Sequence, residues 1–170
     1  MIKFLIRRSA LPLFLVLLLA GGCASLGLGV LAPRFSMAGD QPSQLRLLGP
    51  SLDRPLGGAS VRIYARIENP NPMGITLSAL TGRLSLEGVE AADANFPLGM
   101  PLAANGSAVV PLDISVSFSS LPRVAELVGQ AVLRGSVSYS LDGVATVDAG
   151  LLGPTSFGPM KLVSGALSTR

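Results

Sequence analysis

The chain contains no histidine, no tryptophan and a single cysteine in 170 residues. Without histidine, it lacks the side chain that most often acts as a general base or binds a metal. One cysteine cannot form an intrachain disulfide, and alone it cannot hold zinc. The sequence also has no Gly-x-Ser-x-Gly motif, no P-loop and no dinucleotide-binding glycine motif. We therefore predict a non-enzymatic protein with no catalytic residue, metal or cofactor, whose stability depends on a packed core.

Aromatic residues make up only 5% of the chain, which argues against a groove that stacks bases or sugars. The 13 lysines and arginines exceed the 10 acidic residues by three. Lys3, Arg7 and Arg8 account for this excess, because 13 − 3 = 10 basic residues remain against 10 acidic ones in the rest of the chain. With a formally neutral remainder, we expect no nucleic-acid partner.

The N-terminus has the layout of a secretory signal. Its basic residues precede an apolar run at 11–20, which is too short to span a bilayer as a stable helix. The following Leu-Ala-Gly-Gly-Cys sequence resembles a bacterial lipobox, in which a diacylglyceryl group is attached to the thiol before cleavage. It departs from that pattern at Ala20, three positions before Cys23, where leucine is usual. The alternative is an ordinary signal peptide followed by an unpaired cysteine.

A lipobox would explain an unpaired thiol in an exported protein. We therefore predict that residues 1–22 are a signal peptide and that Cys23 is the lipid attachment site. Ala24 after the cysteine resembles the sorting pattern of outer-membrane lipoproteins, so the expected location is the periplasmic face of the outer membrane. Residues 23–42 are rich in small residues and proline, and we interpret them as a lipidated tether, whose leucines could instead lie along the membrane surface.

Alternation of apolar and polar residues predicts half-buried strands at 60–68 and 107–118. The residues expected to be buried are Ile63, Ile67, Val110, Leu112, Ile114 and Val116. Those expected to be exposed are Arg62, Arg66, Asp113 and Ser115. Between the two strands, Ile75 and Leu77 are out of phase with the later leucines, which predicts a bulge or a strand break near residues 78–79.

Two pairs, Asn105-Gly106 and Asp142-Gly143, predict type I′ hairpin turns, the second joining 136–141 to 144–149. Pro97 and Pro101 before the first pair predict an edge strand. A helix is predicted after Ser120, with Pro122 in its first turn. Its apolar residues recur at helical spacing: Val124, Leu127, Val128 and Ala131. We expect it to close one end of a sheet core, and contact with a membrane surface is the alternative.

These patterns predict an all-β protein, with seven or eight short strands in an antiparallel immunoglobulin- or fibronectin-like β-sandwich and one short helix. The predicted folded domain covers residues 43–168. A composition of 49% hydrophobic and 14% charged residues is typical of a folded chain rather than a disordered one.

The strand at 60–68 ends in Asn69-Pro70-Asn71-Pro72. Each asparagine precedes a proline and is therefore held in an extended conformation, and neither proline can donate a backbone hydrogen bond. The motif is thus a strand terminator, and we expect Asn69 or Asn71 to hydrogen-bond nearby backbone. We predict that its role is structural.

An alternating strand that ends in Asn-Pro-Asn, followed by 75–88, a polar turn and the strand at 107–118, resembles the water-stress-and-hypersensitive-response (WHy) domain of the late embryogenesis abundant group 2 family. The resemblance extends over about residues 43–168, and bacterial members often carry a lipobox. It implies a β-sandwich with a helix, an association with desiccation or stress responses, and no catalytic residues.

Two classes of function agree with the sequence. The first is a protective or structural domain held at a membrane by its lipid, with protein or envelope partners. The second is a carrier of an apolar ligand such as a lipid chain. A carrier needs an enclosed void of a few hundred Å³, whereas a packed core has almost none.

Overall fold

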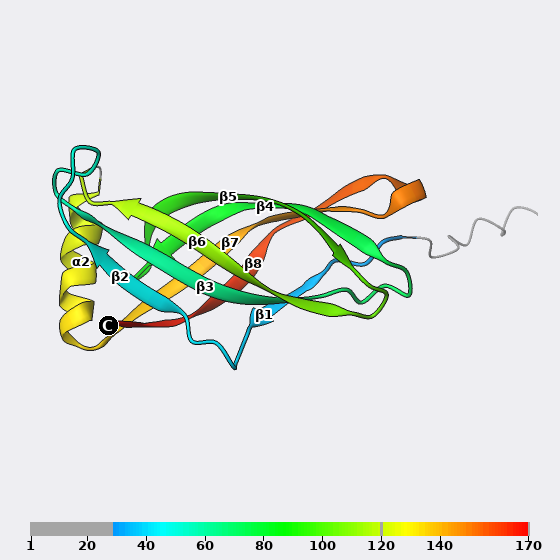
Figure 1. Cartoon of the computed structure of the whole chain (residues 1–170), viewed down its shortest axis with the longest axis horizontal. Coiled ribbons are helices and arrows are strands. Elements are labelled where there is room, and N and C mark those ends of the chain that lie inside the picture. The colour runs from blue at the N-terminus through cyan, green and yellow to red at the C-terminus, as the bar shows by residue number, and fades with distance from the viewer. Residues whose placement is uncertain (1–28, 120, 170) are drawn as a thin grey trace, which may run out of the picture.

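The computed structural model describes residues 29–119 and 121–169, which form eight strands, one α-helix and one short 3-10 helix (Figure 1). The strands are β1 (Arg34–Met37), β2 (Gln44–Leu48), β3 (Gly58–Glu68), β4 (Ile75–Leu86), β5 (Val89–Leu102), β6 (Ser107–Ser117), β7 (Ser136–Asp148) and β8 (Pro154–Thr169). The helices are α2 (Pro122–Leu133) and η1 (Gly150–Leu152). The predicted signal peptide 1–22, Cys23 and Ser120 lie outside the described residues.

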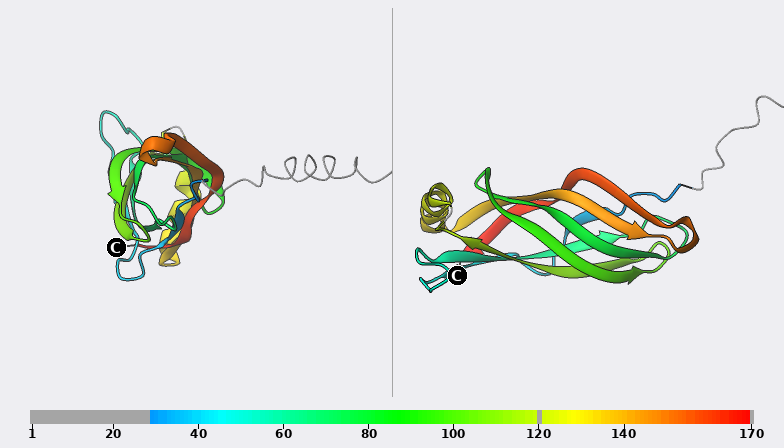
Figure 2. Two further views of the ribbon diagram at one scale, coloured as in Figure 1. Left: turned by 90° about the vertical axis from the view of Figure 1, so that its right-hand side faces the viewer. Right: turned by 90° about the horizontal axis from the view of Figure 1, so that it is seen from above.

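The strands form two antiparallel layers that meet along one side. In the first layer, β3 pairs with β6 along its whole length and with β1 and β2, one after the other, on its opposite side. In the second layer the order is β8, β7, β4, β5. The layers join where β2 runs parallel to β8, with Gln44 beside Ser168. The all-β, sandwich-like class with one short helix is confirmed, and Figure 2 shows the strands surrounding a common core.

The alternation in β3 and β6 places the predicted residues in the core. All six are at most 7% exposed: Ile63, Ile67, Val110, Leu112, Ile114 and Val116. Asp113 and Ser115 face solvent, and Arg66 is half-buried. Arg62 lies directly opposite Asp113 and binds it through Nε–Oδ1 at 2.6 Å and Nη2–Oδ2 at 3.0 Å. A register slip of one residue would turn this ion pair into the core.

The predicted irregularity near residues 78–79 is a bulge within one strand. The register of β4 shifts between Leu77 and Ala79 against both β5 and β7. The extra residue reverses the phase of the alternation, so that Leu77 before the bulge and Leu80 after it are both buried. The prediction is therefore confirmed.

The predicted hairpin at Asp142-Gly143 is wrong. β7 runs through both residues without a turn, and Gly143 lies opposite Gly82 of β4. A Cβ atom on Gly143 would overlap the carbonyl oxygen of Thr81 and lie 2.6 Å from the Cα of Gly82. This glycine thus permits close approach of two strands instead of a turn.

The turn before β6 also differs from the prediction. It is closed by a hydrogen bond from Gly106 N–H to the oxygen of Ala103, and of the predicted pair Asn105 alone has a positive φ, 53°. The strands that it joins pair with different neighbours, since β5 pairs with β4 and β6 with β3. The pattern of a type I′ turn occurs instead at Glu87 and Gly88, with φ of 49° and 76°. Among the described strands β5 pairs with β4 alone, so the predicted edge is confirmed.

Helix α2 closes one end of the sandwich, as predicted. It has Pro122 in its first turn and buries Val124, Val128 and Ala131, while Leu127 is half-buried. This helix end also contains the loop at 49–57 and the turn at 87–88. The opposite end, here called the motif end, consists of residues 31–34, 68–74, 103–106 and 148–153 (Figures 1 and 2).

Part of the predicted tether belongs to the sheet. β1 lies within residues 23–42 and pairs antiparallel with residues 65–68 of β3, so the prediction is wrong from Arg34 onward. Pro33 before β1 and Ala38 after it are buried. A strand of four residues is too short to show an alternation in a segment rich in glycine and proline. Of the helices in the described part of the chain, none is long and apolar enough to cross a membrane.

Candidate functional site at the Asn-Pro-Asn corner

Two buried asparagines occupy the centre of the motif end. Asn69 is 1% exposed and Asn71 is 3% exposed, whereas Pro70 is half-buried and Pro72 is exposed. A buried amide without hydrogen-bond partners destabilises a fold by several kcal/mol. The hydrogen-bond partners of the two asparagines therefore show which segments of the chain this corner joins.

Asn69 uses its side-chain amide entirely within the corner. Its Nδ2 donates to the carbonyl oxygens of Met73 at 2.8 Å and Ala103 at 2.9 Å. Its Oδ1 accepts hydrogen bonds from the backbone N–H of Asn71 at 3.0 Å and from Asn71 Nδ2 at 2.9 Å. Both donors and both acceptor positions of the amide are thus used. Asn69 connects the end of β3 to the approach to β4 and to the turn before β6.

Asn71 holds the N-terminal segment against the sandwich. Its Oδ1 accepts a hydrogen bond from the backbone N–H of Leu31 at 2.7 Å. Its Nδ2 donates to the carbonyl oxygen of the same residue at 3.0 Å. The side-chain amide therefore pairs with Leu31 as the backbone of a neighbouring strand would. This contact joins residues that are 40 positions apart.

The backbone of the motif is also satisfied by the turn before β6. Asn69 N–H donates to the oxygen of Gly106 at 2.8 Å, and Asn105 N–H donates to the oxygen of Asn71 at 3.0 Å. The prolines carry no N–H and need no partner. Both asparagines thus hydrogen-bond backbone at the exit of β3, as the sequence leads us to expect. That their role is structural alone stays a prediction.

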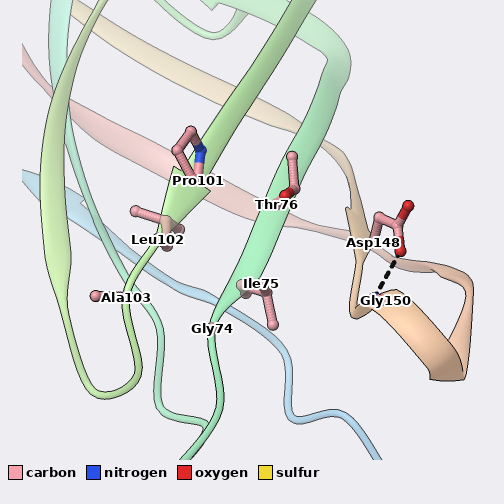
Figure 3. Close-up of a pocket in the computed structure, with 8 residues that line it drawn as sticks. All are labelled: Gly74, Ile75, Thr76, Pro101, Leu102, Ala103, Asp148 and Gly150. Carbon is pink, nitrogen blue, oxygen red and sulfur yellow. Dashed lines mark hydrogen bonds between the residues drawn. The ribbon is translucent and has the colours of Figure 1, made fainter.

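Two pockets open at the motif end. The larger, of about 640 Å³, lies among the start of β4, the end of β5 and the connection from β7 to β8 (Figure 3). Ile75 and Leu102 in its wall are each 3% exposed, so its floor is formed by the core. The smaller pocket, of about 360 Å³, is lined by polar groups that include Arg34, Glu68 and Asn69.

The lining of the larger pocket offers little for catalysis. Its charged residue is Asp148, whose Oδ1 accepts a hydrogen bond from Gly150 N–H at 2.8 Å (Figure 3). This bond lies at the start of the short helix η1 that follows. Among residues 29–119 and 121–169, no three Asp, Glu, His or Cys side chains lie close enough to hold a metal ion.

A carboxylate with a perturbed pKa lies at the helix end instead. The backbone N–H of Ser138 donates to Glu87 Oε1 at 2.6 Å and lowers the pKa of Glu87. The Ser138 hydroxyl and Arg134, whose guanidinium is 2.9 Å from Oε2, also lower the pKa of Glu87. Partial burial of the carboxylate has the opposite effect and raises this pKa. Glu87 does not line either pocket. Its contacts join the β4–β5 turn to the start of β7.

The sequence identifies the two asparagines but not their hydrogen-bond partners, of which Leu31 is the most distant along the chain. An asparagine before a proline is extended and can present both amide groups to another segment. Nothing in the sequence near Leu31 identifies that segment, because residues 24–33 show no periodicity. Long-range pairing of this kind becomes visible only in the folded structure.

A family model of the late embryogenesis abundant proteins, LEA_2, matches residues 64–161, more than half of the chain. The chain belongs to the LEA_2 family. The matched part of this LEA_2 protein includes the Asn-Pro-Asn corner and the strands β4 to β7. No curated protein matches the chain in sequence.

Solved structures resemble this LEA_2 protein in fold. The solution structure of AT1g01470 from Arabidopsis thaliana superimposes with a TM-score of 0.59 and 17% identity, covering 84% of this chain and 85% of that one. A crystal structure from Archaeoglobus fulgidus gives 0.44 and 14%, covering 76% and 97%. The solution structure of At2g46140.1, described as a candidate late embryogenesis abundant protein, gives 0.41 and 20%, covering 91% and 85%. At 17% identity, the resemblance to the AT1g01470 structure establishes the fold alone.

Proposed function

We propose that this LEA-type protein is a non-enzymatic bacterial lipoprotein of the WHy kind, anchored through Cys23 to the periplasmic face of the outer membrane. There it protects the envelope during desiccation or a related stress through contacts with envelope components. Membership of LEA_2 supports the stress-related part of the proposal. The lipobox-like sequence before Cys23 supports the anchor.

The observation that carries the proposal is the attachment of Leu31 to Asn71. Leu31 follows Cys23 by 31 − 23 = 8 residues, and its backbone is fixed to a buried side chain by two hydrogen bonds. Eight residues span at most about 29 Å even when fully extended. A lipid on Cys23 would therefore keep the motif end within about 29 Å of the bilayer surface.

The larger pocket does not favour the carrier alternative. It opens at the end of the sandwich and is not enclosed between the layers. The space between the layers contains large aliphatic side chains that are less than 2% exposed, among them Leu77, Leu84 and Leu141. A lipid chain would have to displace these side chains, which would cost their packing energy.

Fractionation of cells expressing the wild type and Cys23→Ser tests the anchor. We expect the wild type in the outer-membrane fraction, labelled by an incorporated fatty acid, and the variant released or unprocessed and unlabelled. Ala24→Asp is the matched control, because it keeps the cysteine and should change only the membrane in which the lipidated protein is found. A Cys23→Ser protein that is processed and membrane-bound like the wild type would overturn the anchor.

A drying experiment tests the stress function separately. Cells that express the wild type should survive drying and rewetting better than cells that lack the protein, and Cys23→Ser should not restore survival. Equal survival of all three strains would contradict the protective role without affecting the result of the fractionation.

A further inference from the structure

The motif end exposes large apolar side chains. Leu151 is 107% exposed, Leu31 57%, Leu152 46% and Met73 40%, relative to the reference for each residue type. They come from three separate segments: the N-terminal segment, the Asn-Pro-Asn corner and the β7–β8 connection. Because the helix end also exposes leucines, exposure alone does not decide which end meets an apolar phase.

Leu151 and Leu152 lie in a connection whose backbone is held by hydrogen bonds. Helix η1 begins where Asp148 accepts the bond from Gly150, and it ends with Gly153 N–H donating to the oxygen of Gly150 at 3.0 Å. Gly150 and Gly153 have φ of 64° and 74°, a backbone conformation that glycine adopts without strain. The connection is thus an ordered turn beyond the ends of β7 and β8 (Figure 1), and it contains the fully exposed Leu151.

The position of the N-terminal segment decides which end of the domain lies near the bilayer. It reaches the sandwich at the motif end, where Asn71 binds Leu31 (Figure 1). The helix end lies at the far side of strands such as β3, whose ten residue steps from Gly58 to Glu68 extend about 33 Å. A lipid on Cys23 would therefore bring the motif end, and not the helix end, to the bilayer.

We infer that the motif end rests on the lipid bilayer, with Leu151 and Leu152 inserted among the lipids and Leu31 and Met73 at the interface. This inference rests on the proposed lipid anchor and adds a second attachment to it. One anchor and one apolar contact together fix the orientation of the domain, with α2 pointing away from the membrane. They also turn the open mouth of the larger pocket towards the lipid, since Gly150 lines it (Figure 3).

The charges of the motif end agree with a contact driven by apolar burial. Among the described residues there, Arg34 is basic and Glu68 and Asp148 are acidic, and all three are exposed. A surface without an excess of basic residues gains nothing from anionic lipids. We therefore expect the contact to form equally well on zwitterionic and on anionic vesicles.

The helix end provides a matched control, because it also exposes leucines. Leu52 is 102% exposed in the loop at 49–57, close to the value of Leu151. In the mature lipoprotein the thiol of Cys23 would be blocked by the lipid, so an introduced cysteine would be the sole reactive thiol of the chain. Leu151→Cys and Leu52→Cys can then each carry a fluorophore that responds to apolar surroundings.

The experiment reconstitutes the two labelled lipoproteins into phosphatidylcholine vesicles with and without spin-labelled lipid, and into vesicles with added phosphatidylglycerol. We expect at least twofold stronger quenching and a blue-shifted emission for the label at position 151, in both lipid mixtures, after thermal melting has shown that both variants are folded. Equal quenching at the two positions on anchored protein would overturn the inference and leave the anchor standing. A reactive thiol at Cys23 and protein free of the vesicles would overturn both.

Discussion

The side chain of Asn71 binds both backbone polar groups of Leu31, accepting from its N–H at 2.7 Å and donating to its oxygen at 3.0 Å. Asn71 in turn donates to Asn69, which binds the carbonyl oxygens of Met73 and Ala103. One chain of amide contacts thus connects the N-terminal segment to the exit of β3 and the turn before β6. The motif end is held together by side chains where no strand can continue.

The two asparagines should differ in their effect on stability. Asn69→Ala leaves the buried N–H of Asn71 and two carbonyl oxygens without their partner, at a cost of about 1–3 kcal/mol for each group left unpaired. Asn71→Ala frees Leu31, an exposed residue whose backbone can bind water, so its cost should be smaller. Urea unfolding of the two variants measures this order. Unchanged unfolding accompanied by loss of partner or lipid binding would make the motif a recognition site.

Hydrogen exchange can detect the contact between Asn71 and Leu31 directly. The amide of Leu31 should be protected in the wild type and should exchange faster in Asn71→Ala, while amides in the centre of β3, such as that of Ile63, stay protected. Rapid exchange at Leu31 in the wild type would contradict the proposed attachment of the N-terminal segment.

Truncation in β6 should separate its two faces. Ile114 is 4% exposed, and Ile114→Ala should destabilise the domain by about 2–5 kcal/mol because it leaves a cavity. Ser115→Ala on the opposite face should change stability by no more than about 0.5 kcal/mol. Chemical denaturation measures both. Similar losses at the two positions would mean that both faces of β6 are covered.

Two glycine substitutions should have opposite signs. Gly143→Ala should destabilise the protein by about 1–3 kcal/mol, because the added Cβ would overlap the backbone of β4 at Thr81 and Gly82. Gly129 lies within α2 with open space around it, so Gly129→Ala should stabilise the protein by about 0.5–1 kcal/mol. Melting temperatures of the pair test the close approach of β7 to β4. A Gly143→Ala protein as stable as the wild type would contradict it.

The reasons why the sequence predicted some elements and not others are physical. β3 and β6 were predictable because each has one buried face, which imposes a period of two. The hairpin at Asp142-Gly143 failed because glycine also permits close packing of strands, and the sequence does not separate the two uses. The turn at Glu87-Gly88 was missed because glutamate rarely adopts a positive φ, and here its carboxylate is held by Ser138 and Arg134.

The same carboxylate predicts a pH dependence. The pKa of Glu87 is lowered in the folded protein by the Ser138 N–H, so its stabilising effect is complete above the unfolded value near 4.5. The effect is lost as the pH falls through the lower folded value. Glu87→Gln should therefore lose less stability than the wild type as the pH falls from about 5 to about 3. Urea midpoints across this interval measure the difference, and the exposed Glu126→Gln on α2 is the control. Identical slopes for Glu87→Gln and the wild type would contradict the assigned contacts.

Intact-mass analysis of the mature protein tests the account most directly. We expect a chain that begins at Cys23, lacks residues 1–22 and carries the added mass of a diacylglyceryl group on its first residue. Such a protein would have its lipid within eight residues of the Leu31–Asn71 contact, as the proposed orientation at the membrane requires. A mature protein that begins elsewhere, or one whose Cys23 has a free thiol, would contradict the account.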